Sequence, residues 1–149
     1  MKQCATCKEY KDLSEFHKNY KTKDKKQYNC KTCQIKISKD YSKQNPDKVL
    51  FGGAKYRAKK YGGKITITPN WILKKLQAGI CELTGLPFDF SKMEGQHKNP
   101  FSPSLDRIDS KNRDYTPENT RVVLTGVNMA LNEQTLETMK PIFKALAEL

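Results

Sequence analysis

Four of the five cysteines in this 149-residue chain occur as two pairs, each with two residues between its members: Cys4 and Cys7, then Cys30 and Cys33. Thiolates at this spacing reach one ion from a single tight turn, and two such turns complete a tetrahedron of sulfur ligands. Disulfides and free thiols are the alternatives. No apolar leader follows Met1 to indicate an oxidising compartment, and four cysteines within a basic stretch of 33 residues are hard to explain as core filler. We therefore expect a structural Zn²⁺ site, which stabilises the fold and does no chemistry because sulfur fills all four positions.

A second group of residues that could do chemistry lies towards the C-terminal end. The alternation around Asp106 predicts a strand over 105–108, and the apolar run at 121–124 predicts another. A helix is predicted to begin near Gly126. Strand, polar loop, strand and helix make a ββα unit, which can bring Asp106 close to Asn128. Such oxygen ligands suit one hard divalent metal ion.

The sequence of this segment resembles that of the HNH, or ββα-metal, endonuclease family. The family's core reads roughly Asp-His-Ile-Asp, a polar loop, then Asn-Leu-x-x-Leu-x-x-x-x-His. The run 106–109 is similar to that opening, with Arg107 in place of the first histidine. Asn119 begins the middle motif, and Asn128, nine residues later, stands where the family has its last histidine. The segment looks most similar to a phage and prophage subgroup, which also carries a stretch like 81–88. The N-terminal cysteine pairs resemble the zinc-bearing start of phage HNH and endonuclease VII-like proteins.

The resemblance implies hydrolysis of DNA phosphodiester bonds with a catalytic Mg²⁺ or Mn²⁺. It implies Asp106 and Asn128 as ligands of that metal. It implies Asn119 as a catalytic-site residue that braces the loop between the strands, with contact to the metal as its second role. Arg107 cannot accept a proton near neutral pH because its guanidinium stays charged, so we interpret it as a clamp on the scissile phosphate. The general base is unassigned, and the candidates stay open: water activated by the metal, His97, Asp109 or Tyr115.

The net charge of +12 lies in the first part of the chain. Residues 1–64 hold 18 basic and 6 acidic side chains, whereas residues 65–149 hold 10 of each. An excess confined to one segment indicates a surface that binds a polyanion, although lysines also keep small domains soluble. A helix is predicted from Pro46 to about Tyr61, with lysines along one face. The expected DNA contacts are these lysines together with Arg107: Lys48, Lys55 and Lys59.

These segments predict a small α+β protein in three parts. Residues 1–44 form a zinc ribbon that binds DNA, 45–64 form a basic linker helix, and 65–149 form an HNH-like ββα-metal nuclease domain.

The last part needs further elements around the ββα unit. We expect a helix that begins at Thr68-Pro69 and ends at Gly79, then a strand and hairpin over 80–88. A C-terminal helix with Pro141 in its first turn is expected to pack on the ββα unit.

The composition excludes an integral membrane protein, because no apolar run approaches the roughly 18 residues that a membrane span needs. We expect DNA as the partner, no membrane, the cytoplasm of a bacterial host, and either a monomer or a homodimer. The leading function is a metal-dependent DNA endonuclease, encoded by a phage or prophage, that nicks DNA or cuts both strands. The alternatives are a non-catalytic zinc-ribbon DNA-binding protein derived from an HNH nuclease, and a phage packaging accessory.

Overall fold

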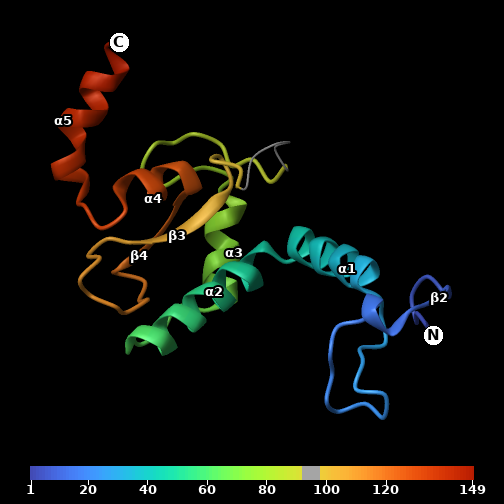
Figure 1. Ribbon diagram of the computed structural model, residues 1–149. Helices are drawn as coiled ribbons and strands as arrows, with labels where there is room; N and C mark the ends of the chain where they lie inside the picture. The colour runs from blue at the N-terminus through green and yellow to red at the C-terminus, as the bar shows by residue number, and fades with distance from the viewer. Residues whose placement is uncertain (92–97) are drawn as a thin grey trace. The chain divides into compact units, whose positions relative to one another are not determined.

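The computed structural model describes residues 1–91 and 98–149, and the chain divides into two compact units, Met1–Asn45 and Pro46–Leu149. Within these residues, helices accompany two small antiparallel sheets of two strands each (Figure 1), so the expected α+β class is confirmed. In the described part of the chain, no helix combines the length and apolar character needed to cross a bilayer.

In the first unit, one cysteine pair lies between two short strands and the other at the start of a helix. Its elements are β1 (Lys2–Gln3), β2 (Tyr10–Lys11), the 3-10 turn η1 (Leu13–Glu15) and α1 (Lys31–Gln44). Strands β1 and β2 pair antiparallel, and the first cysteine pair lies in the turn between them. Cys30 is the residue before α1, and Cys33 lies in its first turn. Helix α1 was not predicted from the sequence, and it fills the segment between the second cysteine pair and Asn45.

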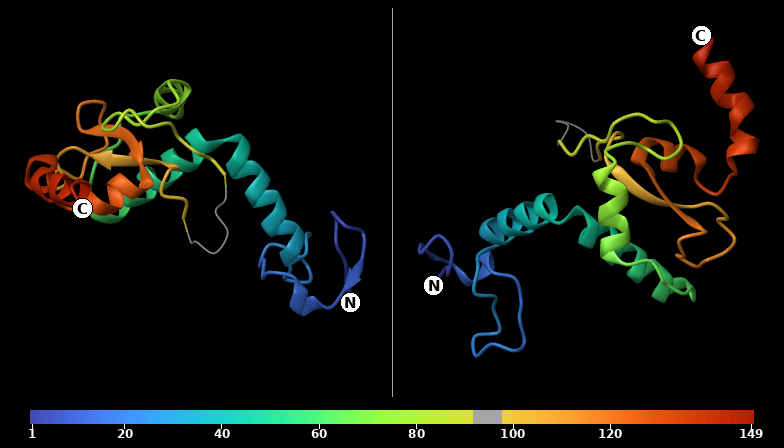
Figure 2. Two further views of the ribbon diagram at one scale, coloured as in Figure 1. Left: turned by 90° about the horizontal axis from the view of Figure 1, so that it is seen from above. Right: turned by 180° about the vertical axis from the view of Figure 1, so that it is seen from behind.

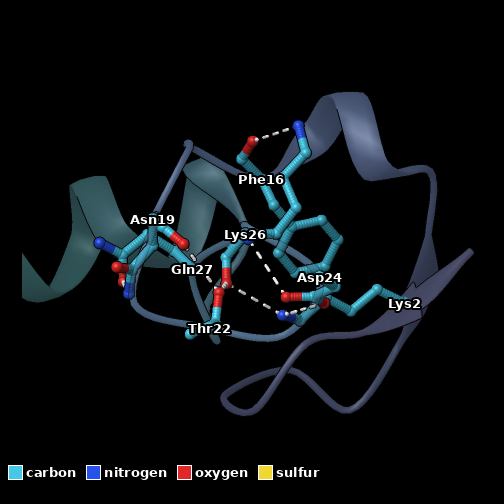
Figure 3. A network of polar contacts seen from close by, with 7 residues as sticks. All are labelled: Lys2, Phe16, Asn19, Thr22, Asp24, Lys26 and Gln27. Atoms are coloured by element: carbon cyan, nitrogen blue, oxygen red, sulfur yellow. Dashed lines mark hydrogen bonds and ion pairs between the residues drawn. The ribbon is translucent and has the colours of Figure 1, made fainter.

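Polar contacts tie the loop between η1 and α1 to strand β1 (Figure 3). The Lys2 ammonium lies 2.6 Å from the Asp24 carboxylate and donates to the Lys26 carbonyl at 3.1 Å. The Thr22 hydroxyl lies 2.9 Å from the carbonyl oxygens of Asn19 and Lys26. Hydrogen bonding to Lys2 lowers the pKa of Asp24. These contacts hold the loop in place where apolar packing is scarce.

The second unit is built around the hairpin β3–β4 and the helix that follows it (Figures 1 and 2). Its elements are α2 (Pro46–Tyr61), α3 (Pro69–Gln77), β3 (Pro103–Arg107), β4 (Thr120–Leu124), α4 (Thr125–Leu131) and α5 (Leu136–Ala147). Helix α4 contacts both strands, α2 packs against α3 and β3, and α3 also contacts β4. The core between them is apolar and includes Ala54, Ala58, Ile72, Leu105 and Val122.

The helix expected as a linker is part of this second unit. It forms over Pro46–Tyr61, and its Ala54 and Ala58 are 0% and 3% exposed in the core that α3, β3 and β4 complete. Small side chains at these two positions let α2 approach the sheet closely. A boundary between the units therefore falls at Asn45, before the helix, and not after it.

Two other expectations for this unit meet different outcomes. Helix α3 begins as predicted, because the Thr68 side chain accepts a hydrogen bond from the Trp71 amide at 3.2 Å. The hairpin expected over 80–88 is instead a turn closed by a single antiparallel bridge between Ile80 and Pro87. The hydrogen bonds of this bridge run from the Cys81 amide to the Leu86 carbonyl and from the Phe88 amide to the Gly79 carbonyl, each at 2.9 Å.

Helix α5 begins earlier than expected and packs less. Thr135 is its N-cap and accepts a hydrogen bond from the Thr138 amide at 3.2 Å, so Pro141 lies inside the helix. None of its residues is buried, which corrects the expected close packing on the ββα unit. Leu136 and Phe143 instead border an apolar cleft whose other lining residues come from α4 and from the turn at 83–84.

The segment after α2 is held against the loop between β3 and β4. A Cβ atom at Gly63 would lie 2.1 Å from the carbonyl oxygen of Arg113, so only glycine fits there. The Lys64 amide donates to the Asp114 carboxylate at 2.7 Å, and the Tyr115 amide donates to the Lys64 carbonyl at 2.9 Å. These contacts place Tyr115 beside the segment that directly follows α2.

We expect Gly63→Ala to lower the free energy of unfolding by about 1–3 kcal/mol, because the clash is with backbone that cannot rotate away. Gly52→Ala is the matched control: it lies inside α2, and a Cβ atom there meets nothing within 4 Å. That substitution should raise the free energy of unfolding by about 0.5–1 kcal/mol. Thermal and denaturant unfolding would measure both, and a Gly63→Ala protein as stable as wild type would refute the close approach.

Candidate active site and metal centre

The two cysteine pairs come together in the first unit. The sulfur atoms of Cys4, Cys7, Cys30 and Cys33 all lie within 4.8 Å of one another. A tetrahedral zinc ion with bonds of about 2.3 Å separates its sulfur ligands by about 3.8 Å, so the four thiols fit this geometry with little movement. Two of them are buried and two are half-buried, which closes the site to substrate.

The crowded thiols differ in acidity. The backbone amide of Cys30 donates to the Cys4 sulfur at 3.2 Å and lowers the pKa of Cys4 to about 6. A hydrogen bond with the Cys30 side chain, together with burial, raises the pKa of Cys33 to about 12, which favours its protonated thiol. A bound cation removes this difference by stabilising every sulfur as a thiolate.

Little else holds the first unit together. Among the described residues of its core, Phe16 is buried between Cys4 and Cys30 and contacts no larger apolar cluster. So small a core cannot offset the entropy of ordering the chain, which is the situation in which a metal or disulfide takes over the role of the core.

In the second unit, the strand register places Asp106 opposite Arg121. The Arg121 guanidinium donates to Asp106 Oδ2 at 2.7 Å, and the two side chains are 16% and 6% exposed. The other carboxylate oxygen, Oδ1, has no hydrogen-bond partner in the described part of the chain. Asp106 is thus held by one oxygen and offers the other to a ligand.

Asn128 closes the ββα unit. It lies in α4, and its amide nitrogen donates to the Ser104 hydroxyl at 2.7 Å and to the Leu105 carbonyl at 3.1 Å. Because a carbonyl can only accept, the amide nitrogen faces β3 and the amide oxygen faces away from it. The orientation of this oxygen, like that of Asp106, comes from a hydrogen bond on the opposite side of the group.

Two guanidinium groups approach Tyr115, which is 3% exposed. The Cζ atom of Arg107 lies 5.6 Å from the centroid of the tyrosine ring, and Arg107 also donates to the Asn112 carbonyl at 3.3 Å. Arg57 of α2 donates from Nε to the tyrosine hydroxyl at 2.7 Å. Tyr115 is therefore in contact with two positively charged side chains.

Asn119 is buried in the loop between β3 and β4. Its side-chain oxygen accepts a hydrogen bond from the Asp109 amide at 2.9 Å, and its nitrogen donates to the Asp114 carbonyl at 2.9 Å. The nitrogen also lies 3.4 Å from the Asn112 carbonyl. Both ends of the Asn119 amide are therefore hydrogen-bonded to the loop between β3 and β4.

One cleft of about 340 Å³ collects most of these groups. Its lining includes Asp106, Arg107, Tyr115 and Asn128, together with Arg57 and Lys98. Among the described residues that line it, Asp106 is the one carboxylate, and Arg121 already neutralises it. The cleft is therefore positively charged and suits an anionic ligand.

Several residues singled out in the sequence do not line this cleft. Asp109 is exposed, and its carboxylate accepts the Lys111 amide at 2.9 Å, which is the contact of a turn residue. His97 lies outside the described residues. The expected DNA contacts on α2 are exposed and do not line the cleft: Lys48, Lys55 and Lys59.

Two arginines of this site were not predicted from the sequence. Arg121 could have been found, because a strand residue opposite Asp106 is fixed once the register of the hairpin is known. No sequence signal pointed to Arg57, which reaches the cleft from a helix about 50 residues earlier in the chain.

The β3–β4–α4 unit with a polar cleft beside it is an arrangement of the HNH type. The chain is similar to the solved structure of PacI, which is described as a rare-cutting HNH restriction endonuclease with an extraordinary mechanism of DNA perturbation. The likeness covers 99% of this chain and 94% of PacI, with a TM-score of 0.50 and 19% identical residues. No protein-family model and no curated protein sequence matches the chain. The HNH-type fold implied by the sequence is therefore confirmed.

Proposed function

We propose that this protein is a metal-dependent DNA endonuclease that hydrolyses phosphodiester bonds in the cleft beside β3 and α4. The observation that carries the proposal is the convergence of the Asp106 carboxylate, the Asn128 amide and the Arg107 guanidinium on one positively charged cleft. The HNH-type fold supports the same conclusion. The phage or prophage origin rests on the resemblance of the 104–132 segment alone.

Asp106 and Asn128 would hold the catalytic Mg²⁺ or Mn²⁺. Asp106 Oδ1 and the Asn128 side-chain oxygen suit such an ion, because both are hard oxygen donors that no other described residue engages. When bound, the ion supplies stabilisation for the negative charge that develops on the phosphate. Arg121 holds the carboxylate in place, and Ser104 and Leu105 hold the amide.

Arg107 would bind the scissile phosphate. Its guanidinium presents several donors in a planar fork that matches phosphate oxygens, and the Tyr115 ring limits its orientation. Because Arg107 remains protonated, another group must accept the proton of the attacking water. The candidates for that base are water activated by the metal, His97, Asp109 and Tyr115.

The four cysteines would hold Zn²⁺ as a structural ion. The compact arrangement of their sulfur atoms supports this assignment, and the filled coordination sphere leaves no position for substrate.

The test is conversion of supercoiled plasmid to nicked or linear DNA with Mg²⁺ or Mn²⁺, with and without EDTA. Cleavage that needs the divalent ion and stops with EDTA supports the enzyme. Binding of DNA without cleavage under every metal condition would favour the second candidate, a DNA-binding protein derived from an HNH nuclease. The positive charge of residues 1–64 is the observation that supports this second candidate.

The lysines on α2 offer a test of the DNA-binding surface. We expect a variant with Lys48, Lys55 and Lys59 all changed to Gln to bind DNA more weakly and with less salt dependence. The slope of log affinity against log salt should fall by about 0.9 for each phosphate that the variant no longer neutralises. The matched control changes three exposed lysines elsewhere and removes the same charge: Lys74, Lys140 and Lys144. Equal weakening in both variants would show that net charge, and not the α2 face, sets the affinity.

A further inference from the structure

The cleft contains a positive group that the proposed chemistry does not use. Arg57 comes from α2, outside the ββα unit, yet it lines the same cleft as Asp106 and Arg107. Its Nε atom is bound to the Tyr115 hydroxyl, whereas its terminal Nη atoms have no hydrogen-bond acceptor in the described part of the chain. An arginine has five N–H donors, so four of them remain for a ligand.

The position of the Arg57 guanidinium is fixed by its contact with Tyr115. Tyr115 is buried, and its backbone amide donates a hydrogen bond to the Lys64 carbonyl in the segment after α2. Its hydroxyl then fixes the plane of the Arg57 guanidinium. A preoriented guanidinium loses less conformational entropy when it binds a planar pair of oxygens.

Arg57 and Arg107 lie at similar distances from the same ring, with Cζ atoms 5.5 and 5.6 Å from its centroid. Both guanidiniums line the same cleft, so each can contribute a positive charge to the binding of one polyanion. The nearest carboxylate of the cleft, Asp106, is already paired with Arg121. A strand with regularly spaced phosphates can occupy both guanidiniums at once, with one phosphate on each.

We propose that Arg57 forms a second phosphate-binding position, which holds a DNA phosphate next to the one that Arg107 binds, with Tyr115 as its positioning residue. This inference rests on the proposed DNA substrate, but it concerns binding and does not require cleavage. It assigns a role in substrate alignment to a helix that lies outside the nuclease motif.

The test is DNA binding by the full-length protein in EDTA, followed by fluorescence anisotropy over a range of salt concentrations. We expect Arg57→Gln to weaken binding about tenfold and to lower the salt slope by about 0.9. Arg57→Lys should restore the slope, because it keeps the charge, but not the full affinity, because it lacks the planar fork. Tyr115→Phe should weaken binding with the slope unchanged, since it frees the guanidinium without removing its charge.

Lys140→Gln is the matched control, because it removes one exposed positive charge from α5, away from the cleft. The inference is overturned if folded Arg57→Gln protein keeps the wild-type affinity and slope, or if Lys140→Gln weakens binding as much. A wild-type protein that binds DNA and shows the Arg57 effect, yet cuts no plasmid, would refute the nuclease and retain this phosphate position. A wild-type protein that binds no DNA would refute both.

Discussion

Replacing Asp106 by alanine is expected to reduce plasmid cleavage by about 100-fold or more while leaving DNA binding largely intact. The substitution removes the carboxylate that would hold the catalytic metal, and stabilisation of the developing phosphate charge disappears with it. Binding rests on positive side chains elsewhere and should change little. The measurements are the rate of plasmid nicking with Mg²⁺ and the affinity for DNA in EDTA.

Two controls separate this effect from damage to the fold. Asp106→Asn keeps the shape of the side chain and an acceptor for Arg121, so it should stay folded and remain inactive. Asp109→Ala removes a carboxylate that is exposed and outside the cleft, so it should retain most of the cleavage rate. If Asp106→Ala cuts as fast as wild type, the proposed active site is wrong.

Replacing Cys30 by serine is expected to unfold the first unit and to lower the zinc content from about one ion per chain to near zero. A serine hydroxyl is a poor zinc ligand, and Cys30 is 1% exposed in a core that holds little besides Phe16. Because metal binding and folding are coupled in such small modules, losing one ligand removes most of the folding free energy. Metal analysis and limited proteolysis would show zinc loss and cleavage confined to Met1–Asn45.

Cys81 offers the matched control for this substitution. It is as buried as Cys30 but lies in the second unit, where its sulfur accepts a hydrogen bond from the Leu124 amide at 3.4 Å. A serine hydroxyl can accept the same bond, so Cys81→Ser should keep its zinc and the proteolytic pattern of wild type. Reduced wild-type protein with far less than one zinc per chain would contradict the assignment, as would a Cys30→Ser protein that retains the ion.

The start of α3 and the ββα unit were predictable because their determinants are local. A threonine cap begins α3, and the residues of β3, β4 and α4 follow one another within about 30 positions of the chain. The cysteine spacing is equally local, since two residues between ligands let one turn present both. In these places, residues close together in the sequence determine the local structure, so composition and periodicity are enough to predict it.

The membership of the cleft was decided by tertiary structure. Arg57 enters it because Ala54 and Ala58 bury α2 against the sheet and because Gly63 lets the chain pass Arg113. These contacts join segments about 50 residues apart, and no periodic pattern records which distant surface a helix will cover.

The charge state of the site was also decided by packing. The sequence by itself determined that Asp106 stands in an HNH-like motif, but only the strand register placed Arg121 across from it. Likewise, the sequence determined two cysteine pairs, and the fold brought all four sulfur atoms to within 4.8 Å of one another. The physical reason is the same in both cases: residue types set which interactions are possible, and burial of apolar surface selects which of them form.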